Sequence, residues 1–186
     1  RAYENGRAAV AADERDADAH FALGRILYLR REFPASLKEF ETAIVLNPNF
    51  AHAYLGHGGA LLFDGRFFES IEACDQAARL SPHDPVMWTI QTIKALSLIG
   101  LSEIDRAVAV GRECTRQPNA PWTAYMAFAS ALGHAGERDE GTRVLGRISE
   151  MKPDFKIDDV RRILTFRDAS HLELVVEGIR HIGLET

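Results

Sequence analysis

Four of the seven prolines of this chain recur at nearly constant intervals, and each of the four follows a stretch with helical periodicity. Pro48 and Pro82 are 34 residues apart, Pro82 and Pro118 are 36 apart, and Pro118 and Pro153 are 35 apart. The segments around three of them are similar in sequence: LNPNF at 46–50, LSPHD at 80–84 and MKPDF at 151–155. A repeat of this length holds two antiparallel helices, and a proline after the second helix ends it. We therefore predict an all-α fold, a right-handed α-solenoid of stacked helix pairs.

Small residues occur where the paired helices are expected to meet. Gly24 and Gly58 lie at matching places in first helices, and Ser36 and Ser70 occupy matching places in second helices. Antiparallel helices approach closely only where small side chains face each other at the crossing. This spacing supports the same pairing in at least the first two units.

The repeat spacing divides the chain into six segments. The third repeat is the most degenerate, and its first helix is expected from Pro85 to Ile99. In most pairs, glycines are expected to supply the permissive backbone of the turn between the two helices. The last segment is expected to hold a short helix near 157–164 and a terminal helix near 169–182 that caps the array. The segments are 1–16, the second helix of a truncated repeat; 17–50, 51–84, 85–120 and 121–154, the four repeats; and 155–186, the capping helices.

Residues 17–153, about three quarters of the chain, resemble tetratricopeptide repeats. The resemblance implies a fold whose stacked first helices line a concave surface for binding. The residues expected on that surface are Phe21, Arg25, Tyr28, His52, Leu55, Leu62, Thr92, Leu96, Met126 and Ser130. Most are apolar or neutral, which favours an amphipathic helix or an extended segment as the ligand. Some of them, Leu55 and Leu96 above all, could equally pack between repeats.

The end of the chain resembles a second family. The motifs RRILTFRD at 161–168 and EGIRHIGL at 177–184, with SPHDPVMW at 81–88, are similar to the C-terminal repeat region of certain bacterial regulators. In those proteins a class III adenylyl or guanylyl cyclase domain, or a winged-helix DNA-binding domain, precedes the repeats. Because the chain begins at Arg1 without Met, we expect it to be part of such a longer protein. None of the upstream catalytic or DNA-reading residues lies in this sequence, so no catalytic role is assigned.

Composition argues against several classes of function. The 27 acidic side chains outnumber the 22 basic ones and are interspersed with them, which disfavours direct nucleic-acid binding. No apolar run reaches the roughly 20 residues of a membrane helix. The two cysteines, Cys74 and Cys114, form no CxxC pair and fit a reducing compartment, so we expect a cytoplasmic protein.

Three patterns that suggest chemistry have simpler structural explanations. His57, Gly58 and Gly59 resemble the oxyanion-stabilising turn of lipases, but no GxSxG nucleophile motif accompanies them. His52 and His57 are five residues apart and diverge on a helix, whereas a zinc pair would be four apart. The cysteines occupy small buried positions of the repeat. We predict no catalytic residue, no metal site and no cofactor.

Two functions remain open at this stage. The first is a protein-binding scaffold or regulatory module, whose partner is a protein or peptide, an upstream domain of the same polypeptide, or a second copy. The second is a small-ligand sensor that holds a metabolite near Tyr28, His52 and Met126. An enzyme, the third class considered, has no supporting motif.

Overall fold

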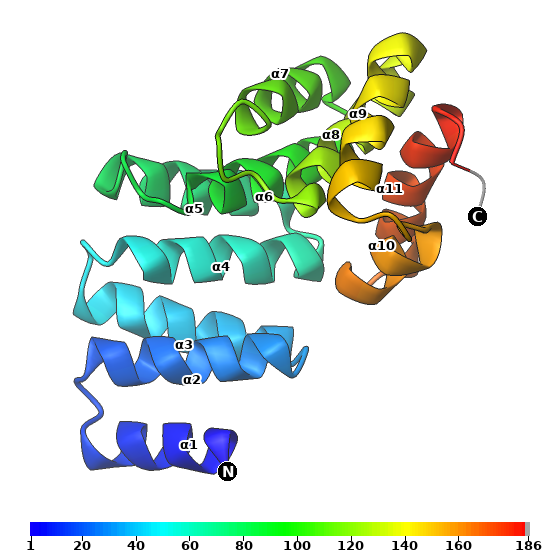
Figure 1. Cartoon of the computed structure of the whole chain (residues 1–186). Helices are drawn as coiled ribbons and strands as arrows, with labels where there is room; N and C mark the ends of the chain where they lie inside the picture. The colour runs from blue at the N-terminus through cyan, green and yellow to red at the C-terminus, as the bar shows by residue number, and fades with distance from the viewer. Residues whose placement is uncertain (185–186) are drawn as a thin grey trace. The chain divides into compact units, whose positions relative to one another are not determined.

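The fold is entirely helical. A computed structural model describes residues 1–184, and within that range it contains eleven α-helices and no strand, which confirms the predicted all-α class (Figure 1). The helices are α1 (Ala2–Ala12), α2 (Ala17–Leu29), α3 (Phe33–Leu46), α4 (Ala51–Asp64), α5 (Phe67–Leu80), α6 (Met87–Gly100), α7 (Ile104–Cys114), α8 (Trp122–Ala135), α9 (Arg138–Met151), α10 (Ile157–Ile163) and α11 (Ala169–His181).

The helices form two compact units, Arg1–Asp84 and Pro85–Thr186, which we call unit 1 and unit 2. In unit 1, α2 pairs with α3, α4 pairs with α5, and α4 also packs on α3. In unit 2, α6 pairs with α7, α8 pairs with α9, and α8 also packs on α7. Within each unit, the second helix of one pair is therefore covered by the first helix of the next.

Phe40 of α3 is the central side chain of unit 1. It is 1% exposed and lies between two glycines, Gly24 of its own pair and Gly56 of the next pair. A methyl group on Gly56 would lie 2.6 Å from the Phe40 ring, so only glycine leaves room for the ring. In unit 2 the sizes are reversed: the second helix carries Gly111, and the ring of Phe128 from α8 fills the space.

A buried hydrogen bond recurs in both pairs of unit 1. The hydroxyl of Ser36 donates to the carbonyl oxygen of Gly24 at 2.8 Å, and that of Ser70 donates to the carbonyl oxygen of Gly58 at 2.7 Å. Both serines are fully buried. Since a buried hydroxyl without a partner is costly, these bonds specify how each second helix seats on its first helix.

The four turns within the pairs share one closure. The N-cap residue of the next helix donates its backbone N–H to a leucine carbonyl five residues earlier, at 2.9–3.0 Å; the acceptors are Leu27, Leu61, Leu98 and Leu132. This Schellman closure requires a residue with positive φ just before the donor. Two of these residues are glycines, Gly65 and Gly136, but the other two are Arg31 at 62° and Ser102 at 60°.

Two sequence expectations are therefore wrong in detail. Gly100 does not supply the permissive backbone of its turn, because α6 includes it and Ser102 takes the positive φ. Pro85 does not lie in the first turn of a helix, since α6 begins at Met87 after the N-cap residue Val86. The positive-φ residues are spaced by 34, 37 and 34 residues, so the insertion lies between α5 and α6.

Replacing Ser102 by glycine should stabilise the protein. The left-handed conformation costs a non-glycine residue about 1 kcal/mol, partly offset by the greater chain entropy of glycine when unfolded. We expect Ser102→Gly to raise the free energy of unfolding by about 0.5 kcal/mol, measured by urea denaturation with an unchanged slope. Gly136→Ala is the matched control and should lower it by about 1 kcal/mol. A destabilising Ser102→Gly would mean that the Ser102 side chain has a structural role.

Candidate functional site

The first helices of unit 1 present a partly apolar surface. Phe21, Arg25 and Leu29 are spaced four residues apart on α2, and therefore lie along one side of it. Phe21 is half-buried against Phe40 and Phe50, and the Arg25 guanidinium lies 5.7 Å from the centre of its ring. Leu29 is 76% exposed.

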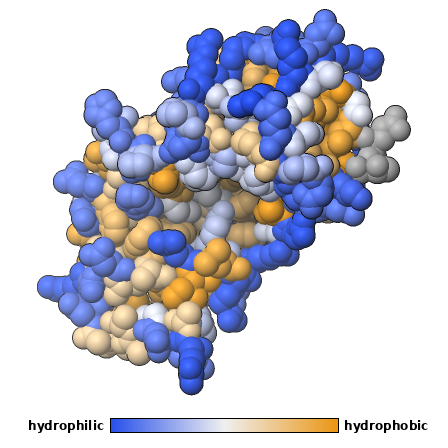
Figure 2. Space-filling model, viewed as in Figure 1, coloured by the Kyte–Doolittle hydropathy of each residue, from blue (hydrophilic) through white to orange (hydrophobic). Residues whose placement is uncertain are grey.

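The neighbouring first helix, α4, contributes His52 and Leu55. The His52 side chain is about half exposed, and its Nε2 atom lies 3.5 Å from the Asp84 carboxylate. Leu55 is half-buried one turn further along. We call Phe21, Arg25, Leu29, His52 and Leu55 together the α2–α4 surface. Figure 2 shows exposed apolar side chains between hydrophilic ones over unit 1.

Tyr28, which the sequence predicts on this surface, is half-buried, and its ring packs inside unit 1. Its ring packs against Phe33 and Phe63, with ring centres 6.0 and 5.8 Å away. Burial raises the pKa of its hydroxyl to about 12, because the phenolate would lose its hydration. Tyr28 therefore belongs to the packing between the helix pairs of unit 1.

Five more predicted surface residues are turned inward. Leu62, Leu96 and Met126 are at most 3% exposed and pack inside their units. The Thr92 hydroxyl donates to the Trp88 carbonyl and lies 3.7 Å from the Cys114 sulfur, so it faces α7. Ser130 is fully buried beside Gly178 of α11. Four of these five positions are buried, and Thr92 is half-buried.

Leu29 is the surface residue that sequence reasoning missed. Its spacing from Phe21 and Arg25 is the signal that could have identified it. It is the last residue of α2 and remains largely exposed although its side chain is apolar.

Helix α3 is flanked by two histidine–glutamate pairs. His20 Nδ1 of α2 lies 2.6 Å from a Glu39 oxygen, and its Nε2 atom lies 3.2 Å from the Glu14 carbonyl. On the other side, His57 Nε2 of α4 lies 3.5 Å from a Glu41 oxygen and is buried without a hydrogen bond to any described residue. Burial lowers the pKa of His57, outweighing the attraction of Glu41.

The cysteines lack the environment of reactive thiols. Both Cys74 and Cys114 are buried, and neither forms a disulfide. Burial raises the pKa of Cys114, and its sulfur donates weakly to the Trp88 carbonyl at 3.4 Å. A buried thiol with a raised pKa carries little of the nucleophilic thiolate.

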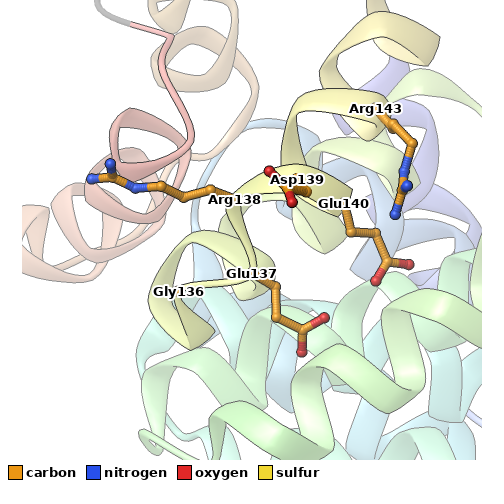
Figure 3. A pocket seen from close by; sticks show the side chains of 6 residues that line it. All are labelled: Gly136, Glu137, Arg138, Asp139, Glu140 and Arg143. Carbon is orange, nitrogen blue, oxygen red and sulfur yellow. The ribbon is translucent and has the colours of Figure 1, made fainter.

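An open pocket of about 380 Å³ lies at the start of α9 in unit 2. Figure 3 shows its charged lining, with Glu137 and Glu140 extending away from Arg138; the lining residues are Gly136, Glu137, Arg138, Asp139, Glu140 and Arg143. Arg112 of α7 pairs with Glu137 at 3.2 Å and with Glu140 at 2.7 Å. Arg112 holds the pKa of Glu140 below its usual value, so this carboxyl is ionised and poorly suited to act as an acid.

Within residues 1–184, no group of three His, Cys, Asp or Glu side chains is placed to hold a metal ion. None of the helices described over that range is both long and apolar enough to span a membrane.

Comparison with known proteins supports the fold. Residues 17–50 match the family model described as tetratricopeptide repeat, and a comparison with curated proteins gives no match. Among solved structures, YrrB, described as a TPR protein with an unusual peptide-binding site, is 18% identical over 97% of this chain and 93% of its own, with a TM-score of 0.67. PilW, a type IV pilus biogenesis factor, is 17% identical over 96% and 82%, with a TM-score of 0.75. TTC0263, a thermophilic TPR protein of Thermus thermophilus, is 16% identical over 97% and 88%, with a TM-score of 0.69.

Stability at mildly acidic pH should depend on His57. Since its folded pKa lies below 6.5, the unfolded chain binds more protons as pH falls through 6.5, and the folded state loses stability there. Above that value the histidine is neutral in both states and the effect vanishes. We expect the thermal midpoint of His57→Gln to fall less than that of the wild type between about pH 7.5 and 5. The thermal midpoints are measured by circular dichroism. If the midpoint falls equally in His57→Gln and in the wild type, His57 does not have this role.

Proposed function

We propose that this chain is a protein-binding module, because residues 17–50 match the tetratricopeptide repeat and the fold is shared with TPR proteins. Its ligand is a helical or extended segment of a protein, bound on the α2–α4 surface. The observation that carries the proposal is the stripe of Phe21, Arg25 and Leu29. Phe21 is anchored by aromatic neighbours, whereas Leu29 exposes three quarters of its surface on the same side of the helix.

The surface combines the features of a recognition site. Aromatic and arginine side chains are enriched at protein interfaces and often supply much of the binding energy. Phe21 is already positioned by Phe40 and Phe50, so little of its motion would be lost on binding. Arg25 has no ion-pair partner among the residues described, which leaves its charge available to a carboxylate of the ligand.

We assign the chain no catalytic step of its own. Two carboxylates of the pocket in unit 2, Glu137 and Glu140, are paired with Arg112, and the thiol of Cys114 is buried. The peptide-binding site named for YrrB supports a binding role for this fold.

We also propose that the module works in the cytoplasm as the C-terminal part of a larger bacterial signalling or transcriptional regulator. The support is the similarity of the motifs at 81–88, 161–168 and 177–184 to the repeat regions of such proteins. An upstream domain of the same polypeptide would then be one candidate ligand of the α2–α4 surface.

Leu29→Glu should weaken partner binding at least about tenfold, because a charge would replace the apolar contact that Leu29 makes with the bound partner. Val45→Glu is the matched control: Val45 is 78% exposed, like Leu29, but lies on the second helix α3. Both changes are at exposed positions and should leave helicity unchanged.

The measurement is quantitative mass spectrometry of proteins captured from the source cell by the tagged wild type and by both variants. A partner lost with Leu29→Glu and kept with Val45→Glu supports the α2–α4 surface. A partner kept by both variants, or lost with both, would move the docking site elsewhere.

A further inference from the structure

The last helix of unit 2 does not take the place of a further first helix. In the repeats, α4 packs on the preceding second helix α3, and α8 packs on α7. Helix α11 instead packs mainly against α8 and also contacts α6. Both α6 and α8 are first helices, so α11 covers the face of unit 2 that corresponds to the α2–α4 surface of unit 1.

Helix α11 is amphipathic, and it buries its apolar side. Val175, Val176 and Ile179 are at most 1% exposed, whereas Glu173, Glu177 and Arg180 are exposed. An amphipathic helix that lays its apolar side on a surface is a common form of peptide ligand.

The crossing of α8 and α11 accepts only glycine. A methyl group on Gly133 would overlap the carbonyl oxygen of Gly178, and a methyl group on Gly178 would overlap that of Ser130. Backbone atoms cannot move aside as a flexible side chain can, so the two helices meet backbone to backbone.

Polar contacts orient the docked helix. The His134 Nε2–H of α8 donates to the Leu174 carbonyl of α11 at 2.7 Å, and the His134 and His181 rings meet edge to face at 5.8 Å. Beside them the buried hydroxyl of Ser130 has no hydrogen-bond partner among the described residues. The face formed by α6 and α8 therefore contacts three features of α11: a glycine at the crossing, the apolar side of the helix and one of its backbone carbonyls.

Few contacts attach α11 to the helix before it. Helices α10 and α11 contact each other only slightly, and an exposed ion pair, Arg161 with Glu173 at 3.0 Å, joins them. The connecting residues 165–167 follow an extended Leu164. The apolar side of α11 thus finds its partner in the α6–α8 face and hardly at all in α10.

We propose that the α6–α8 face is a helix-binding site which α11 occupies in cis, and that a partner helix with glycine at the crossing can replace α11. A tethered ligand acts at an effective concentration near millimolar, so an external helix binds weakly while α11 is docked. Releasing α11 would open the site. The inference concerns unit 2 alone and does not depend on the α2–α4 surface.

Three variants of the full chain test this. Gly178→Ala should release α11 and leave the site intact. Gly133→Ala should release α11 and also block the site. Gly146→Ala is the control, because Gly146 lies on α9 and a methyl group there would meet no described atom within 4 Å. The probe is a fluorescent peptide of residues 169–182, which carries the wild-type Gly178.

Hydrogen exchange and peptide binding are then measured on each protein. We expect amide protection of α11 to fall at least about tenfold in Gly178→Ala and Gly133→Ala, with α6–α9 still protected, and to be unchanged in Gly146→Ala. The peptide should bind Gly178→Ala at least about tenfold more tightly than the wild type, and should gain nothing with Gly133→Ala.

Each other outcome overturns the proposal. If α11 stays protected in Gly178→Ala, the crossing does not control docking. If α6–α9 lose protection together with α11, then α11 is part of the fold of unit 2 and is not a ligand. If α11 is released but the peptide does not bind Gly178→Ala, the face does not accept a helix in trans.

Discussion

The close approach of helices at glycine and other small residues is the constraint on which this structure depends. In unit 1 the Phe40 ring lies between Gly24 and Gly56, so one side chain joins two helix pairs. In unit 2 the ring comes from Phe128 and the space from Gly111. Either arrangement fills the same kind of gap, and a methyl group on any of these three glycines would lie at most 2.9 Å from the phenylalanine ring, so the packing would have to shift. The serine hydroxyls that donate to the Gly24 and Gly58 carbonyls add direction to this packing.

The same constraint separates the two first-helix faces. In unit 2 two glycines, Gly133 and Gly178, bring α11 onto α8, and the apolar side of α11 covers that face. Within unit 1, all of which the structure describes, no helix lies over Phe21, Arg25 and Leu29 in a comparable way, and Leu29 stays largely exposed. A face covered by a helix of its own chain and a face left open are two different starting points for binding. The first requires displacement of α11, and the second requires only a complementary ligand.

Much of the fold could be predicted from the sequence because its signals are local. Proline spacing, helical periodicity and small residues at matching positions predict the all-α class and the pairing of helices that the structure contains. Turn chemistry was predicted less well. The Schellman closure needs a left-handed residue whatever its type, and at Arg31 and Ser102 the chain adopts that conformation without glycine. The hydrogen bonds to Leu27 and Leu98 and the packing of both helices hold these residues there.

The candidate site was harder to predict, because exposure depends on residues distant in sequence. Phe21 and Leu55 are half-buried and Arg25 and His52 are exposed, so all four stay at least partly on the surface. Ser130 does not, because Gly178, far along the chain, packs against it. Periodicity along a helix can identify which side chains share a face. Whether that face remains open depends on which helix docks there, and docking depends on whether two backbones can approach, which is a property of both helices together.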